Sequence, residues 1–187
     1  MSTGYQINDQ EGLYYLTFQI VDWIDIFTRQ VYRDIVIESL RFVIENKNLN
    51  VFAFVIMSNH IHTIMQSSTG ELSNTIRDFK KFTSKRIIET ILSTPESRRE
   101  WMINRFGSNA RQHTRNQIFQ VWTHENHAIY LYGSEFIRDK IEYLHDNPVR
   151  ARLVEKPEDY LYSSARFYAG LDCLIPIVDI GLPWKTI

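Results

Sequence analysis

The segment from Val51 to Gln66 constrains the fold more than any other part of the chain. Val51 to Met57 is a nearly continuous apolar run, which is typical of a central strand. Ser58-Asn59 suits a turn or a bulge, so the strand predicted from His60 to Gln66 follows the first strand or continues it. Successive side chains of a strand point to opposite faces, which places His60 and His62 on one face. Such a pair either binds a divalent metal ion or is an ordinary surface pair.

The rest of the chain alternates between strand-like and helix-like patterns. Strands are expected at Tyr14 to Val21, Ile118 to His124 and His127 to Tyr132, and helices at Arg29 to Asn46, Glu71 to Leu92 and Ser134 to Asn147. This order predicts an α+β fold, in which an antiparallel sheet carries its helices on one face. The other face would then be free for the two histidines.

Composition is that of one globular domain. The 187 residues are 44% hydrophobic, enough for a sizeable core, so we expect a single domain over 1–187 with 1–12 and 170–187 as tails. Cys173 is the one cysteine and cannot form an internal disulfide, which favours a cytoplasmic location. No apolar run approaches the ~20 residues that span a bilayer, so we expect no membrane association.

Charge is distributed unevenly along the chain. The net charge of −1 argues against a nucleic-acid-binding protein, but the segment from Arg77 to Gln117 holds ten Lys or Arg against four Asp or Glu. Arg77, Lys81 and Lys85 follow helical spacing opposite the apolar stripe of their predicted helix. This side of the helix is either a phosphate-binding surface or simply a solvated face.

The helix expected from Ser134 to Asn147 presents two separate stripes. Its inward stripe consists of Ile137, Ile141 and Leu144. Lys140, Tyr143 and Asn147 project together from another side, because they are spaced three and four residues apart. They offer a phosphate contact, a nucleophile and a metal-coordinating oxygen, although a half-buried tyrosine and an asparagine that ends a helix are ordinary alternatives. His145 is interpreted as a solvated helix residue.

Several motifs resemble those of one family when they are taken in order. Val55 to His62 resembles the HUH motif of the single-tyrosine transposases of bacterial insertion sequences. Tyr143 to Ala151 resembles the tyrosine motif of their relatives, the REP-associated tyrosine transposases. Further similar segments are Leu72 to Lys85, Val121-Trp122 with Asn126-His127, and Tyr160 to Ala165. The matches span about residues 14 to 168, and their ordered set is more specific than any single motif.

The resemblance implies a fold and a metal site. The fold would be ferredoxin-like or RRM-like, with the HUH pair on a central strand. His60 and His62 would hold Mg²⁺ or Mn²⁺, and Asn147 occupies the position of the third protein ligand, which is Gln in some relatives. Tyr143 would be the nucleophile. Arg152 stands where many relatives have glycine.

The resemblance also implies an activity. The protein would cleave single-stranded DNA and transfer the strand through a 5′-phosphotyrosine intermediate, on DNA that carries a hairpin. It would act in the cytoplasm, associated with the nucleoid when bound to DNA, as a monomer or homodimer. The expected DNA-contacting residues are Arg77, Lys81 and Lys85 on the backbone, and Lys140, Arg150 and Arg152 nearer the cleaved phosphate.

Two other functions fit the same residues. The first is a regulator that binds hairpin DNA or RNA and has lost cleavage. The second is a metal-dependent nuclease that uses water, in which Tyr143 is structural. The covalent protein–DNA adduct separates both from a transposase-like enzyme.

Overall fold

The computed structural model describes residues 6–112 and 118–182. One four-stranded antiparallel sheet has the order β2-β3-β1-β4. Its strands are β1 (Tyr14–Gln19), β2 (Leu49–Ile56), β3 (His60–Ser67) and β4 (Ile129–Tyr130). The helices are α1 (Gln30–Lys47), α2 (Leu72–Ser93), α3 (Arg99–Arg111), α4 (Ser134–Arg150) and α5 (Ala165–Tyr168), with 3-10 turns at Val21–Trp23, Ile26–Thr28 and Pro157–Asp159.

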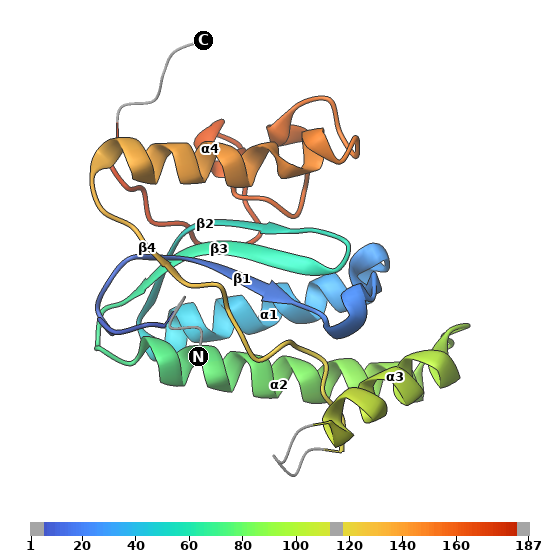
Figure 1. Ribbon diagram of the computed structural model, residues 1–187. Helices are drawn as coiled ribbons and strands as arrows, with labels where there is room; N and C mark the ends of the chain where they lie inside the picture. The colour runs from blue at the N-terminus through green and yellow to red at the C-terminus, as the bar shows by residue number, and fades with distance from the viewer. Residues whose placement is uncertain (1–5, 113–117, 183–187) are drawn as a thin grey trace.

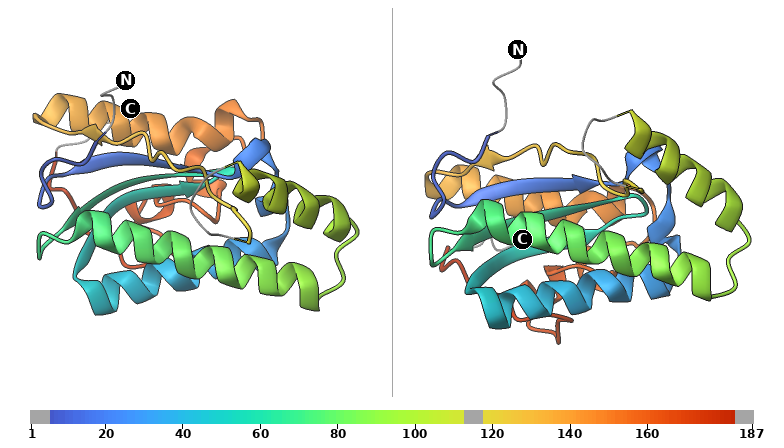
Figure 2. Two further views of the ribbon diagram at one scale, coloured as in Figure 1. Left: turned by 60° about the horizontal axis from the view of Figure 1, so that its bottom comes forward. Right: turned by 90° about the horizontal axis from the view of Figure 1, so that it is seen from below.

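The sheet lies between two unequal helical layers (Figure 1). α1 and α2 run side by side beneath it, as the view from below shows (Figure 2), and α4 crosses the other face. The predicted α+β class, the antiparallel sheet and the central position of the histidine strand are confirmed. The expectation that all helices lie on one face is wrong for α4, which covers part of the face that carries the histidines, whereas α1, α2 and α3 contribute to the core on the other face.

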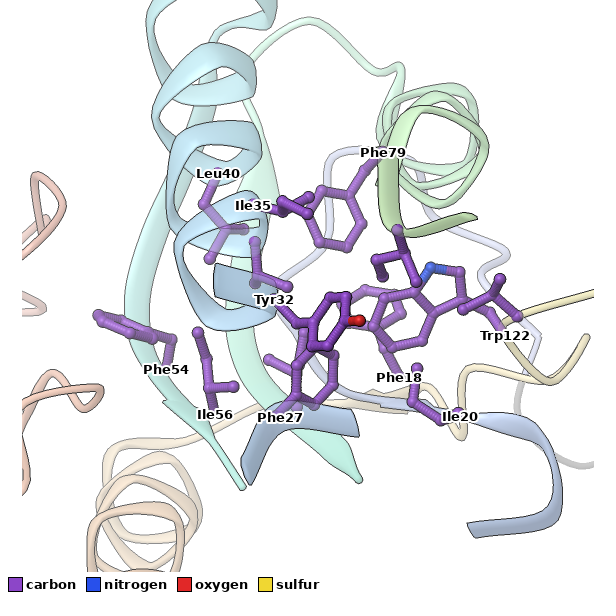
Figure 3. Packing of buried hydrophobic residues seen from close by; sticks show 14 of the residues in the cluster. Phe18, Ile20, Phe27, Tyr32, Ile35, Leu40, Phe54, Ile56, Phe79 and Trp122 are labelled. Atoms are coloured by element: carbon purple, nitrogen blue, oxygen red, sulfur yellow. The ribbon is translucent and has the colours of Figure 1, made fainter. Parts of the chain in front are cut away.

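Alternation along β1 and β3 explains the two layers. Leu16, Phe18 and Ile61 point toward α1 and α2 and are fully buried. Phe18 meets the rings of Phe79 and Trp122 in this larger core (Figure 3). The intervening side chains face α4, since the strand period is two residues.

Three predicted elements differ from expectation, two strands and one helix. The two strands expected between Ile118 and Tyr132 reduce to β4 and one isolated bridge between Ile20 and Trp122. Helix α4 continues through Pro148 to Arg150, whereas the proline predicted an end at the preceding residue.

Side chains of α2 hold the irregular segment that precedes β4. The indole Nε1 of Trp122 donates to Thr83 Oγ1 at 2.9 Å. Lys80 Nζ donates to the Thr123 carbonyl at 2.7 Å and to Asn126 Oδ1 at 2.6 Å. Burial lowers the pKa of Lys80 to about 8. These bonds add to backbone hydrogen bonds between the segment and β1, in which the Thr123 N–H donates to the Gln19 carbonyl and the Thr17 N–H to the Asn126 carbonyl, both at 2.8 Å.

Residues beyond α4 cover the edge of β2. The backbone N–H of Val178 donates to the Val51 carbonyl at 2.9 Å, and the Tyr160 hydroxyl donates to the Ile56 carbonyl at 2.8 Å. These bonds occupy backbone groups that an edge strand would otherwise leave open. In the described parts of the chain, no helix combines the length and apolarity needed to cross a membrane.

Candidate active site

His60 and His62 lie next to each other on β3, with ring centroids 4.7 Å apart. Nδ1 of His60 lies 2.7 Å from Asn59 Oδ1, and Nδ1 of His62 lies 2.9 Å from Thr17 Oγ1. A carboxamide oxygen only accepts, so the proton of neutral His60 is on Nδ1 and its Nε2 carries the lone pair. Contacts of this kind orient histidines that bind a metal through the other ring nitrogen.

Burial keeps both imidazoles neutral. It lowers the pKa of His60. It lowers the pKa of His62 to about 3, with further contributions from His60 and from the Lys140 ammonium. A neutral imidazole is the form that binds a metal ion. The pair is therefore in its metal-binding protonation state at physiological pH.

Tyr143 reaches this pair from α4. Ile141 and Leu144 are fully buried against the sheet, which confirms the predicted inward stripe. Tyr143 projects beside them and stays 44% exposed. Its ring centroid lies 6.4 Å from that of His62. The helix thus brings the predicted nucleophile to the predicted metal ligands from 81 positions further along the chain.

Two cations flank the Tyr143 ring. The Arg150 guanidinium lies 4.9 Å from its centroid, and Lys140 Nζ lies 5.8 Å from it. Lys140, Tyr143 and Arg150 are separated by three and seven residues, which places them along one side of α4. Positive charge on both sides of a phenol favours the approach of a phosphate group.

Asn147 lies within α4 instead of ending it. Its Nδ2 donates to the carbonyls of Tyr143 at 2.8 Å and of Leu144 at 3.3 Å. Pro148 has no N–H to donate to the Leu144 carbonyl, so the Asn147 side chain supplies that bond and the helix continues. The carboxamide oxygen takes no part in these bonds and remains available as an acceptor or ligand.

Sequence reasoning missed Tyr15 and Thr17, which lie on β1 directly beside the histidines. Thr17 is the register partner of His62, and the Tyr15 ring centroid lies 5.3 Å from that of His62. Lys140 Nζ lies 5.4 Å from the Tyr15 ring centre. Burial, with a smaller contribution from Tyr143, raises the pKa of Tyr15. Their alternate spacing on the first strand was a signal, but only the register identifies their neighbours.

The basic residues of α2 lie apart from this site. Arg77, Lys81 and Lys85 are exposed, as their spacing predicted, but α2 lies on the opposite side of the sheet from α4 (Figure 1), whose Tyr143 lies beside His62. Two of them have acidic neighbours. Arg77 Nε lies 3.4 Å from Asp78 Oδ1, and Lys85 Nζ lies 3.8 Å from Glu89 Oε1. Their role in DNA binding stays a prediction.

Arg152 follows α4 in the left-handed backbone region, with a φ of 58°. Glycine adopts this conformation without strain, which gives a physical reason for the glycine of many relatives. The side chain is exposed, and its predicted contact with DNA stays a prediction.

His145 is packed instead of solvated, contrary to the interpretation of the sequence. Its Nε2 lies 2.8 Å from Ser164 Oγ, and its ring centroid lies 5.2 Å from that of Tyr168. Burial lowers its pKa to about 3. His145 therefore fastens α4 to the segment beyond it, on a different side of the helix from Tyr143.

Comparison with known proteins agrees with this geometry. The model of the IS200-like transposase family matches residues 14–120, which is more than half of the chain and includes the histidine pair. A solved structure described as a REP-associated tyrosine transposase bound to a REP hairpin matches with a TM-score of 0.58. It covers 100% of this chain and 99% of that chain at 16% sequence identity, a level that indicates a shared fold. No curated protein matches the chain significantly. The extent of the family match shows that the chain belongs to the IS200-like transposases.

Proposed function

We propose that the protein cleaves single-stranded DNA beside a hairpin and transfers the strand through a 5′-phosphotyrosine at Tyr143. The observation that carries this proposal is the position of Tyr143, whose ring lies 6.4 Å from that of His62 with two cations beside it. The hairpin in the solved transposase complex supports hairpin DNA as the substrate here.

We also propose that His60, His62 and Asn147 hold Mg²⁺ or Mn²⁺. Two neutral imidazoles and one amide oxygen form a mixed nitrogen and oxygen donor set for a divalent ion. Within residues 6–112 and 118–182, no group of three His, Cys, Asp or Glu could hold a metal ion, and the amide oxygen of Asn147 is the third protein donor that we propose. The bound ion would polarise the phosphate and assist departure of the 3′ oxygen.

Tyr143, Lys140 and Arg150 have different roles in the proposed cleavage. The Tyr143 oxygen attacks phosphorus, loses its proton and forms the ester bond, while the bond from phosphorus to the 3′ oxygen breaks. That oxygen takes up a proton and leaves as a free 3′-OH. Lys140 and Arg150 lie where they can attract the phosphate and the developing negative charge.

The covalent ester makes strand transfer possible without a nucleotide cofactor. The 3′-OH of another strand can attack the phosphotyrosine and restore a phosphodiester, because the ester retains the energy of the broken bond. Single-stranded DNA suits this chemistry, since its phosphates are open to a positively charged groove.

Trapping of the adduct tests the proposal. The protein is incubated with Mn²⁺ and labelled hairpin-bearing DNA from the flanks of its own gene, then boiled in detergent. We expect a stable adduct that carries only the fragment 3′ of the cut. Tyr143→Phe should bind the same DNA but form no adduct. Tyr132→Phe is the matched control, because Tyr132 is 71% exposed and lies before α4, and it should form the adduct normally.

The other outcomes identify the alternative functions. Cleavage without an adduct would indicate attack by water and a nuclease. Tight hairpin binding without any cleavage, in the presence of Mn²⁺ or Mg²⁺, would indicate a regulator of DNA or RNA that shares the fold. An adduct that persists in Tyr143→Phe would assign the nucleophile to another tyrosine.

A further inference from the structure

The hydroxyl of Tyr15 is buried and unpaired. Tyr15 is 4% exposed, and its oxygen has no hydrogen-bond partner among the described residues. Thr17 is a polar neighbour that lowers the pKa of Tyr15, but its Oγ1 forms its hydrogen bond with His62 Nδ1 and none with the Tyr15 oxygen. A buried polar group without a partner destabilises the folded state, so phenylalanine would be more favourable here on packing grounds alone.

The neighbouring tyrosine on the same strand provides a contrast. Tyr14 is 2% exposed, faces the larger core and accepts a hydrogen bond from the Asp9 N–H at 3.1 Å. Its hydroxyl is therefore accounted for by structure. The two phenols are equally buried, and only the one on the active-site face has no partner.

Tyr15 shares its surroundings with the proposed nucleophile. The rings of Tyr15 and Tyr143 both contact the His62 ring, at 5.3 Å and 6.4 Å between centroids. Lys140 Nζ lies 5.4 Å from one phenol ring and 5.8 Å from the other. The two phenols also interact electrostatically. The ring of Tyr15 therefore borders the same group of side chains as the ring of Tyr143.

We infer that Tyr15 is a positioning residue, whose hydroxyl donates a hydrogen bond to the Tyr143 oxygen during its attack on phosphorus. The inference rests on the proposed function. A donor that is unpaired at rest and paired during attack stabilises the transition state more than the ground state, which is the condition for a rate increase. The unpaired hydroxyl then has a function that compensates for its cost in stability.

The experiment replaces the hydroxyl and keeps the ring. Tyr15→Phe retains the packing on His62, so it should fold and bind hairpin DNA and Mn²⁺ with wild-type affinity. At saturating DNA, the rate constant of adduct formation should fall about 10- to 100-fold, as expected when one hydrogen bond to a charged group is removed. The melting temperature should rise by about 2–4 °C, because an unsatisfied buried group has been removed.

Tyr14→Phe is the matched control, since it removes the hydroxyl of an equally buried tyrosine from the opposite face. It should leave the rate constant unchanged and should not raise the melting temperature.

A wild-type rate in Tyr15→Phe would overturn the inference and leave the proposed function intact. Weaker binding of DNA or Mn²⁺ with an unchanged rate at saturation would also overturn it, because Tyr15 would then contribute to binding. Absence of an adduct in the wild type would reject the proposed function together with this inference.

Discussion

The two faces of the sheet use the same strands for different purposes. The face toward α1 and α2 is an apolar core in which Leu16, Phe18 and Ile61 are fully buried. The face toward α4 has a smaller apolar cluster and, beside it, the histidine pair and Tyr143. The first face is closed by hydrophobic packing, whereas the second leaves polar side chains partly open to solvent.

This difference shows how one strand can supply both stability and chemistry. Because side chains alternate, a change at one position of β1 or β3 affects one face and not the other. The larger core can stabilise strands that carry costly polar groups on their other side, such as the unpaired Tyr15 hydroxyl. Five sets of substitutions test this separation, from the largest expected effect to the smallest.

Phe18→Ala should have the largest effect and should act on stability. Phe18 is fully buried and contacts the rings of Phe79 and Trp122. Deleting such a ring typically lowers the free energy of unfolding by about 3–5 kcal/mol. Chemical denaturation measures this loss, and calorimetric titration at low temperature should give an unchanged Mn²⁺ affinity. A parallel loss of metal affinity would show that the faces are not independent.

His60→Ala and His62→Ala should affect metal binding more than stability. Each should weaken Mn²⁺ binding by at least about 100-fold, because a metal ligand is removed. The free energy of unfolding should fall by about 1 kcal/mol or less for His60, and by about 1–3 kcal/mol for the buried His62, whose removal leaves the Thr17 hydroxyl without its partner. Calorimetric titration and denaturation are the two measurements. Unchanged Mn²⁺ binding in both variants would return the pair to ordinary surface histidines.

Lys80 is a charged exception on the well-packed side, and it should make stability depend on pH. Burial lowers its pKa to about 8 from 10.5, so between these values the unfolded chain binds more protons than the folded protein. The contribution of Lys80 to the free energy of unfolding should therefore rise with pH across this window, by about 2–3 kcal/mol. Buried tyrosines with a raised pKa, such as Tyr15, oppose this rise, so the rise is measured as the difference between wild type and Lys80→Met in denaturation at pH 8 and 10.5. Lys81→Met, at an exposed neighbour, should retain it.

The basic side of α2 should affect DNA binding without affecting the catalytic face. If Arg77, Lys81 and Lys85 bind phosphates, changing all three to Gln should flatten the salt dependence of single-stranded DNA binding. The slope of log K against log salt should change by about 0.7 for each phosphate that is no longer neutralised. Stability and Mn²⁺ affinity should remain as in wild type. An unchanged slope would mean that this face is only solvated.

Arg152→Gly should have the smallest effect and should be stabilising. Its φ of 58° is strained for any residue with a Cβ. Relief of this strain should raise the free energy of unfolding by about 0.5–1 kcal/mol, measured by denaturation. Arg150→Gly is the control within α4, where glycine should be destabilising by about 1 kcal/mol. Stabilisation together with weaker DNA binding would support the predicted role of Arg152 at the DNA.

Long periodic segments were predictable from the sequence. The helices around Arg29 to Asn46 and Glu71 to Leu92 agree with α1 and α2 to within one residue at each end. The strand pair of β2 and β3 also lies where the apolar run and the histidines indicated. These elements have strong local patterns, and local pattern is sufficient for them.

The failures involve residues whose partners are distant in the chain. Trp122 bonds through its indole to Thr83 on α2 and forms one isolated bridge to Ile20 in place of the predicted strand. His145 is buried because Ser164 and Tyr168 cover it. Pro148 does not end α4, since the Asn147 side chain replaces the missing hydrogen bond. A single-sequence pattern contains none of these contacts.

The sequence by itself determined which residues share a face: His60 with His62 on a strand, and Lys140 with Tyr143 on a helix. Side-chain period is a local property of the backbone, so spacing is enough. Only the tertiary structure decided that α4 crosses the histidine face and brings Tyr143 to His62. The tertiary structure also decided that the buried Tyr15 lies beside His62 and that α2 packs on the opposite face of the sheet. These outcomes depend on how segments far apart in the chain pack together. That packing is decided by burial of the whole core, and the local spacing of residues does not encode it.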